Sequence, residues 1–461
     1  MEPVLLFILG VAIIFVGLAL SIGLHEIGHL LPAKLFGVKV TQYMIGFGPT
    51  LWSRKKGETE YGFKALPLGG YISMIGMFPP KKDGAVRSAS TGFFDTLVQE
   101  GAPDNRADNR ADAKQPGAMS AMAEDARQAS ADTIGEGEEH RAFYKLPVYK
   151  RVIIMLGGPT MNLLIAIVMF AILLMGFGTA QTSTTVGSVS ACALPATSDR
   201  QTCQPGDEAA PGAAAGLEPG DRLVSIGGVA ITSWAQSTQI IREAPGRALQ
   251  VVVERNGTEQ TLNLTPKLTE RFVIGPDGKV TTQTEQVGFV GIGAASELVR
   301  QPITAVLPAV GETIASTAGI IIHLPQRLVD VANAAFGPGE RDPNGPMSMV
   351  GVGRVAGEIA SIDTIPVQSK IASMLGILGS VNIALFVFNL VPLLPLDGGH
   401  IAGALWEGIR RAFAKLFKRP EPGPVDMAKL MPLTLAVVVL LGGMSLLLIY
   451  ADIVKPVNLF G

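Results

Sequence analysis

Four stretches of the chain are long and apolar enough to cross a lipid bilayer, which takes about 20 residues per helix. These stretches are Val4–Phe36, Val152–Ala180, Ile371–Leu396 and Met431–Ile453. Only 16% of the 461 residues are charged, whereas soluble proteins carry about 25%. The sequence therefore predicts a polytopic α-helical membrane protein with four transmembrane helices in a lipid bilayer. A formal net charge of −2 without a basic block argues against binding to nucleic acid.

Basic residues indicate which connections face the cytoplasm. Lysine and arginine gather between the first and second spans and again between the third and fourth, and such residues accumulate in cytoplasmic loops. The stretch from about 181 to 370 and both termini are therefore predicted to be extracytoplasmic. Cys192 and Cys203 lie in this stretch. An oxidising compartment would allow them to form a disulfide, with two free thiols as the alternative.

A fifth apolar stretch, Ile303–His323, competes with this topology. It contains Pro308 and Glu312, and threonine and serine dilute its hydrophobicity. These interruptions favour a helix that lies on the membrane surface or packs on a domain, rather than a span.

The hydrophilic segments differ in composition. Val38–Met77 alternates apolar and polar residues around glycine-rich turns, which is typical of short hairpin strands. Residues 80–142 are rich in alanine and charged residues, have little to bury, and are predicted to be disordered. Gly216–Gly228 resembles the glycine-leucine turn and strand of a PDZ domain, with a generic small β domain as the alternative. A PDZ groove binds a peptide, such as a free C-terminus, as an added strand.

These patterns divide the chain into nine units. In order they are transmembrane helix 1 (1–36), a cytoplasmic membrane-associated β-hairpin region (37–79), a disordered cytoplasmic insertion (80–142), transmembrane helix 2 (152–180), an extracytoplasmic PDZ-like β-rich domain (182–268), an extracytoplasmic connector with a membrane-surface helix (269–370), transmembrane helix 3 (371–400), a cytoplasmic segment (401–430) and transmembrane helix 4 (431–453).

The run His25-Glu26-Ile27-Gly28-His29 lies inside the first apolar stretch. On a helix, His25 and His29 fall on one face one turn apart, so both imidazoles can reach one metal ion. Glu26 can then accept a proton from a metal-bound water. Because ionisable groups within a membrane are costly, this cluster predicts a functional metal site rather than two packing histidines.

A catalytic zinc ion takes three protein ligands, so a third is expected elsewhere. Asp397 is the acid of the third apolar stretch, after two prolines and before two glycines that should break the helix. Its rival Glu407 lies near Arg410 and is expected to be a solvated interfacial charge. With four spans, the first and third run in the same direction, which puts both ligand sets in the cytoplasmic half. A fifth span would put Asp397 in the opposite leaflet.

At this point the chain resembles the site-2 proteases, a family of intramembrane zinc metalloproteases. The motifs are His25–His29, Gly158-Pro159-x-x-Asn162, Pro67-Leu68-Gly69-Gly70-Tyr71, and Asn389 followed by Asp397-Gly398. The single PDZ-like domain, the two nearby cysteines and Arg341-Asp342-Pro343 look most like the actinobacterial regulators of intramembrane proteolysis.

The resemblance implies a bacterial cell-membrane enzyme that binds Zn²⁺ through His25, His29 and Asp397, with Glu26 as catalytic base. It further implies that a hairpin strand holds the substrate in an extended form, aided by Asn389, with Asn162 either catalytic or packing. The strand residues are Gly69, Gly70, Tyr71 and Ile72. Substrates would be single-pass membrane proteins such as anti-sigma factors, after a first extracytoplasmic cut.

Two other functions are compatible with parts of the sequence. A PDZ-bearing membrane scaffold with a vestigial metal site would bind little zinc. A metal transporter would need ionisable residues along several spans.

Overall fold

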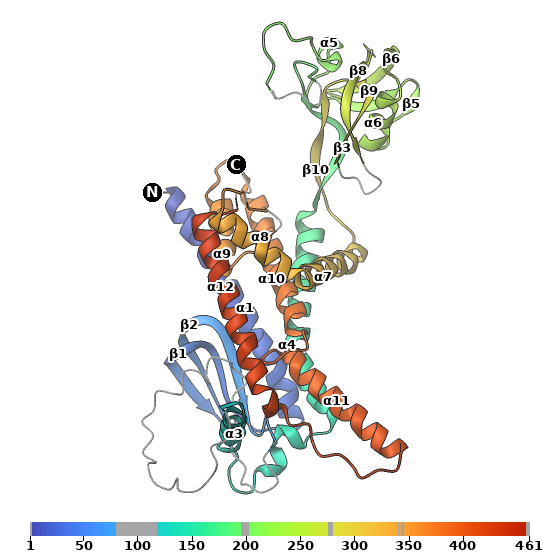
Figure 1. Cartoon of the computed structure of the whole chain (residues 1–461). Helices are drawn as coiled ribbons and strands as arrows, with labels where there is room; N and C mark the ends of the chain where they lie inside the picture. The colour runs from blue at the N-terminus through green and yellow to red at the C-terminus, as the bar shows by residue number, and fades with distance from the viewer. Residues whose placement is uncertain are drawn as a thin grey trace. The chain divides into compact units, whose positions relative to one another are not determined.

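The computed structural model describes residues 2–79, 118–194, 202–274, 280–339, 341–342 and 345–457. The chain divides into two compact units. The helical unit comprises Met1–Leu174 and Pro302–Gly461, and the β-rich unit comprises Met175–Gln301 (Figure 1).

Within the described residues, five helices are long and apolar enough to cross a membrane. They are α1 (Glu2–Leu35), α4 (Val148–Ala171, which continues as a π-helical turn over Ile172–Phe177), α7 (Val306–Ile322, preceded by a 3₁₀ turn), α10 (Val367–Asn389) and α12 (Met431–Val454). The chain is thus a polytopic helical membrane protein with a β-rich domain. Four of these helices lie where the sequence predicts spans, and α7 is the competing fifth stretch.

Helices α1 and α4 cross at very close range. A Cβ on Gly28 would lie 2.3 Å from the carbonyl oxygen of Gly157, and one on Gly157 would lie 2.0 Å from that of Gly28. Small residues let membrane helices approach in this way, because interhelical packing there relies on van der Waals contact. On α1 the crossing point lies between the two histidines, three residues after His25 and one before His29.

Helices α1 and α10 run in the same direction. Gly17 packs on Leu378, and one turn further along both helices the Asn382 amide donates to Ser21 Oγ at 3.0 Å. Shorter helices complete the unit, namely α8 (Leu324–Phe336) and α9 (Met349–Ser361). Helix α9 packs antiparallel on the first half of α1, where a Cβ on Gly10 would lie 2.5 Å from Ala356 O.

The 37–79 region is one hairpin of long strands, β1 (Val40–Lys56) and β2 (Thr59–Met74), rather than several short hairpins. Each strand bends near its middle, so that residues 42–45 pair with 70–73 on one side and with 60–63 on the other. Residues 70–74 therefore form an edge of the folded sheet. The Tyr43 hydroxyl donates to the carbonyl oxygen of Gly23 at 2.8 Å and fixes the hairpin on α1.

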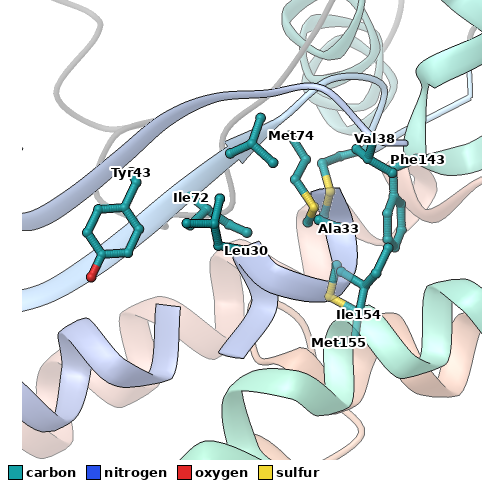
Figure 2. Packing of buried hydrophobic residues seen from close by; sticks show 11 residues of the cluster. Leu30, Ala33, Val38, Tyr43, Ile72, Met74, Phe143, Ile154 and Met155 are labelled. Atoms are coloured by element: carbon teal, nitrogen blue, oxygen red, sulfur yellow. The ribbon is translucent and has the colours of Figure 1, made fainter. Parts of the chain in front are cut away.

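A hydrophobic cluster joins the hairpin to the helices (Figure 2). Its buried members come from the end of α1, from the hairpin, from the turn before α4 and from α4 itself: Leu30, Ala33, Val38, Val40, Tyr43, Ile72, Met74, Met77, Phe143, Ile154 and Met155. Burial of this cluster holds the edge strand in place beside α1.

Two predicted segments differ from the structure. Residues 118–142 of the predicted disordered insertion are ordered and include α3 (Ala118–Ala131) and a 3₁₀ turn (Glu139–Arg141), and a second 3₁₀ turn (Phe143–Lys145) follows directly. The rest of the predicted insertion lies outside the described residues. Arg127 of α3 pairs with Asp426 at 2.7 Å, a partner too distant in sequence to be recognised.

The predicted third transmembrane helix, 371–400, is two helices. α10 ends at Asn389, and α11 (Asp397–Leu416) begins after a turn and extends through about half of the predicted 401–430 segment. The 3₁₀ helix Met427–Leu430 then leads into α12.

The β-rich unit is larger than the predicted 182–268 domain. Its main sheet has the strand order β10-β3-β4-β6-β7, with β5 paired to β4. The strands are β3 (Thr179–Val189), β4 (Arg222–Ile226), β5 (Val229–Ala230), β6 (Leu249–Arg255), β7 (Thr258–Leu264) and β10 (Ile292–Val299). Pairing of β10 with β3 brings 292–299, which was predicted as connector, into the sheet. β8 (Lys267–Ile274) and β9 (Val280–Phe289) form a separate hairpin, and α5 (Pro211–Ala214) and α6 (Trp234–Arg242) complete the unit.

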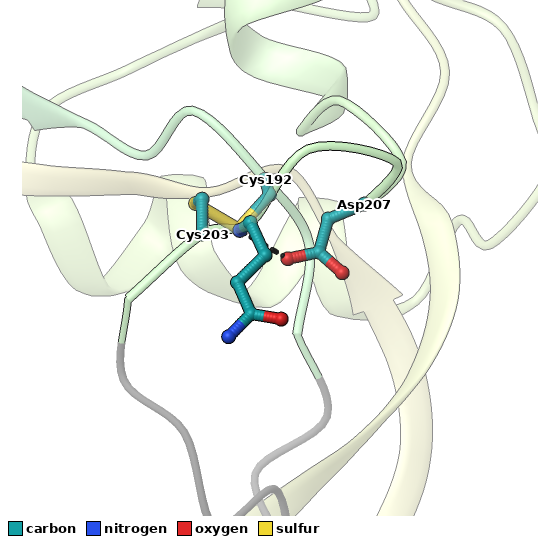
Figure 3. The surroundings of a disulfide bond; sticks show 4 residues. Cys192, Cys203 and Asp207 are labelled. Carbon is teal, nitrogen blue, oxygen red and sulfur yellow. Dashed lines mark hydrogen bonds between the residues drawn. A yellow bond between two sulfur atoms is a disulfide. The ribbon is translucent and has the colours of Figure 1, made fainter.

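Cys192 and Cys203 form a disulfide in this unit, with their Cα atoms 5.8 Å apart. Figure 3 shows Asp207 beside the bridge, where its carboxylate accepts the backbone N–H of Gln204 at 2.7 Å. The bridge joins two residues with a sequence separation of 11.

Candidate metal centre

Helix α1 presents His25 and His29 on one face, one turn apart, with their Nε2 atoms 3.2 Å from each other. Asp397 is the first residue of α11. Its Oδ2 lies 3.4 Å from Nε2 of His25 and 3.3 Å from Nε2 of His29. Within the described residues, the cluster of histidine, cysteine or acidic side chains that could hold a metal ion consists of these three residues. Two helices from opposite ends of the chain thus meet at one point.

The break between α10 and α11 aims the Asp397 carboxylate. Backbone bonds from Leu393 to Val391 and from Leu396 to Leu393 close a tight turn after α10. The start of α11 then packs directly on this turn, since a Cβ on Gly398 would lie 2.3 Å from Val391 O. An uninterrupted helix would carry residue 397 past the imidazoles.

Helix α4 orients both imidazoles from behind. The Nδ1 of His29 lies 2.7 Å from the Ile154 carbonyl oxygen and donates to it, which leaves Nε2 as a lone-pair donor. The Asn162 amide lies 3.1 Å from Nδ1 of His25. In this orientation Oδ1 of Asn162 is buried without a hydrogen-bond partner. If the amide group is rotated by 180°, so that its nitrogen and oxygen exchange places, Oδ1 accepts a hydrogen bond from the Nδ1–H of His25. Such outer hydrogen bonds fix the tautomer of metal-binding histidines.

Gly158 of α4 forms the floor under the two rings. A Cβ at this position would lie 2.2 Å from Nε2 of His29 and 2.7 Å from Nε2 of His25. The position therefore accepts no side chain while the imidazoles stay where they are.

These residues fit a zinc ion. Ligand atoms in a tetrahedral zinc site, at 2.0–2.1 Å from the metal, lie about 3.3 Å from one another. The three separations here are 3.2, 3.3 and 3.4 Å. The Oδ2 of Asp397 is buried without a hydrogen-bond partner, as expected for an atom that binds a cation. Two neutral imidazoles and a carboxylate are a common zinc ligand set.

Glu26 lies next to the ligands and faces the hairpin. The residue is only 8% exposed, and its carboxylate accepts the backbone N–H of Ile72. A Cβ on Gly70 would lie 3.0 Å from Glu26 Cγ, so the missing side chain lets the sheet edge come close to the carboxylate. The edge strand and the metal ligands therefore flank one acid.

The predicted site residues differ in how closely they gather. The structure brings together His25, Glu26, His29, Asn162 and Asp397, with Gly69, Gly70, Tyr71 and Ile72 in the adjacent edge strand. Asn389 is the last residue of α10, before the turn, and is not part of the ligand group.

Sequence reasoning missed Ile154, whose carbonyl oxygen accepts from His29, and the close packing of Gly158 under the two rings. Ile154, Gly158 and Asn162 recur every fourth residue on α4 and so share one face, a spacing that could have indicated a supporting helix. The expectation for Glu407 is wrong. Its side chain is fully buried, and its charge is balanced within the protein because Nη2 of Arg151 lies 2.5 Å from its Oε1.

Comparisons with known proteins agree with this geometry. The profile of peptidase family M50 matches residues 13–420. The chain is 32% identical to zinc metalloprotease Rip1 of Mycobacterium tuberculosis over 469 residues, covering 99% of this chain and all of the relative. It is 31% identical to Rip1 of Mycolicibacterium smegmatis, again over 99% of this chain and all of the relative. Zinc metalloprotease RasP of Geobacillus kaustophilus is 27% identical over 84% of this chain and 86% of the relative. The chain therefore belongs to peptidase family M50, the site-2 protease family of membrane-embedded zinc metalloproteases.

Proposed function

We propose that His25, His29 and Asp397 bind the catalytic zinc ion, with Glu26 as general base, and that the enzyme cleaves single-pass membrane proteins. The observation that carries this proposal is the convergence of three ligand atoms from α1 and α11 at the spacing of a tetrahedral zinc site. Anti-sigma factors already cut outside the membrane are the substrate class that the family resemblance suggests.

Each side chain has a distinct role in hydrolysis. Bound zinc lowers the pKa of its water and polarises the scissile carbonyl. Glu26 takes the proton from the attacking water and delivers it to the leaving amine. The Ile72 N–H that bonds to the Glu26 carboxylate holds it toward the sheet edge. His29, held by Ile154 O, and His25, held by Asn162, keep their Nε2 atoms directed at one point.

The edge strand beside Glu26 suits an unwound substrate. A transmembrane helix satisfies its own backbone hydrogen bonds, and cleavage requires that some of them open. A sheet edge offers replacement partners when the freed segment adds as a further strand. Gly70 lets the sheet edge come close to Glu26, and Asn389 at the end of α10 is suited to help position the substrate segment.

Helix directions support a four-span topology. α1 and α10 are parallel, since Gly17 meets Leu378 and Ser21 meets Asn382. α4 is antiparallel to α1. An odd number of membrane-crossing helices must therefore lie between α1 and α10 in the sequence. This requirement is met if α4 is the single crossing helix between them. In this arrangement α7 packs on the bundle without crossing, and both termini and the β-rich unit are extracytoplasmic.

The β-rich unit is proposed to be a PDZ-like domain that controls access. It would exclude uncut substrates or bind the C-terminus that a first protease exposes. Removal of residues 179–299 should then allow cleavage of full-length substrate, and continued protection of that substrate would contradict the gating role.

Glu26→Gln tests the catalytic assignment. We expect this variant to keep its zinc, because no ligand changes, and to lose cleavage of a co-expressed single-pass substrate, read as fragment size. Glu358→Gln is the control, since Glu358 pairs with Arg354 on α9, away from the ligands. Full activity of Glu26→Gln would refute the base assignment.

A further inference from the structure

We propose that Arg151 and Glu407 are positioning residues, whose buried ion pair holds α11 on α4 so that Asp397 stays within reach of the two imidazoles. This inference rests on the proposed role of Asp397 as a zinc ligand. Neither residue touches the metal centre, and no sequence motif of the site includes them.

The pair is enclosed by protein. The Glu407 side chain is 0% exposed and that of Arg151 is 8% exposed, with Nη2 of Arg151 2.5 Å from Oε1 of Glu407. The carboxylate also accepts from Arg411 at 3.0 Å and from the backbone N–H of Val425 at 3.0 Å. One carboxylate thus links α4, α11 and the segment that leads to α12.

Helix α4 is the common support for all three ligands. Arg151, Ile154, Gly158 and Asn162 lie on one face at spacings of three and four residues. Ile154 and Asn162 form hydrogen bonds with the imidazoles, and Gly158 packs against the rings. Arg151 forms an ion pair with Glu407 on α11, the helix that carries the third proposed ligand. The same rigid element therefore orients the histidines and the carboxylate.

The start of α11 is held by the turn after α10, since a Cβ on Gly398 would lie 2.3 Å from Val391 O and one on Gly399 would lie 2.6 Å from Leu394 N. The body of the helix needs a further contact to hold it on α4. Its apolar residues away from α4 are largely exposed, including Leu405, Trp406, Ile409 and Phe413. Toward α4 it presents small residues, such as Ala404 and Gly408, which pack but do not fix an angle. Glu407 supplies the directional contact on this face.

A modest rotation would disrupt the site. Side-chain atoms lie about 5 Å from a helix axis, so a turn of roughly 20° moves a carboxylate oxygen by about 1.7 Å. Metal sites hold their ligand distances within about 0.2 Å. Asp397 and Glu407 are ten residues apart on one continuous helix, so anchoring the second constrains the first.

The test is the zinc affinity of purified full-length protein in detergent, measured by chelator competition alongside thermal unfolding. Glu407→Gln keeps the volume and the acceptor for Val425 but removes the charge, and we expect about tenfold weaker zinc binding. The control is Asp452→Asn, since Arg341 and Asp452 form a comparably buried pair, each 2% exposed, in the same unit. That variant should lose thermal stability and keep wild-type zinc affinity.

A double variant separates positioning from stability. Replacing both members of a buried ion pair with apolar residues often restores stability. Arg151→Met with Glu407→Leu should therefore unfold near the wild-type temperature and still bind zinc more weakly. Wild-type zinc affinity in Glu407→Gln or in the double variant, or an equal loss in Asp452→Asn, would overturn the inference.

The variant Asp397→Asn shows whether a negative result refutes only the positioning role of the ion pair or also the proposed role of Asp397 as a zinc ligand. Stoichiometric zinc in the wild type that is lost in Asp397→Asn, together with wild-type affinity in Glu407→Gln, would refute the positioning role alone. Equal zinc content in the wild type and Asp397→Asn would refute the ligand assignment itself.

Discussion

Gly158→Ala should damage the metal site without removing any ligand. The added Cβ would lie 2.2 Å from Nε2 of His29, whereas ordinary contacts begin near 3.4 Å. The imidazole must therefore withdraw by about 1.2 Å, or α4 must move away from α1. Either shift is several times the tolerance of about 0.2 Å for metal–ligand distances.

The displacement also affects the second ring, since the same Cβ would lie 2.7 Å from Nε2 of His25. The helix-crossing residue Gly157 is next in sequence, and a Cβ there would lie 2.0 Å from the carbonyl oxygen of Gly28, so moving α4 away from α1 would break this close helix crossing. We expect zinc affinity to fall at least 10- to 100-fold, the range seen when the support of a metal ligand is lost. Cleavage should fall with it.

Zinc content of purified protein, chelator competition and cleavage of a co-expressed single-pass substrate measure the effect together. Gly442→Ala is the matched control, because it lies in a membrane helix of the same unit and its Cβ would meet nothing within 4 Å. Wild-type zinc affinity and cleavage in Gly158→Ala would refute the reasoning that this glycine shapes the site.

Three further outcomes follow from the contacts described. Asn162→Leu should weaken zinc binding by about tenfold in chelator competition, because the imidazole loses its orienting partner, whereas Asn162→Asp keeps an acceptor and should bind nearly normally. Replacing Cys192 and Cys203 together by serine should destabilise the β-rich unit by about 3 kcal/mol in chemical unfolding of the full chain, from the closure of a short loop. The Arg255 hydrogen bond holds the pKa of Asp221 below its usual value. The stability that this pair adds is therefore present at neutral pH and is lost as pH falls below about 4 through the folded-state pKa. Thermal unfolding of the wild type between pH 7 and pH 3 should show this loss, and Asp221→Asn should show a smaller one.

The proposed ligand set was accessible to sequence reasoning because ionisable groups are rare and costly within a membrane. His25, His29 and Asp397 are polar residues in otherwise apolar stretches, and the cost of such residues in lipid predicts a shared function. The structure brings their ligand atoms within 3.4 Å of one another. Hydropathy likewise predicted the starts of α1, α4, α10 and α12 to within about four residues, but it ran the third span past Asn389, where α10 ends.

Contacts between distant segments were not accessible in this way. Glu407 lies near Arg410 in sequence and was expected to face solvent, whereas its buried partner Arg151 comes from a helix 256 residues earlier. Strand β10 was assigned to a connector because its pairing with β3 joins residues more than a hundred positions apart. The order in α3 has the same origin, since its partner Asp426 follows much later.

Because α11 carries the proposed zinc-binding carboxylate at its first residue and the proposed anchor Glu407 about three turns later, its length over that interval should resist evolutionary insertion or deletion. Each residue added between Asp397 and Glu407 would twist one end against the other by about 100°. Beyond Arg411, where the helix extends toward Leu416 with exposed side chains, relatives should tolerate gaps freely.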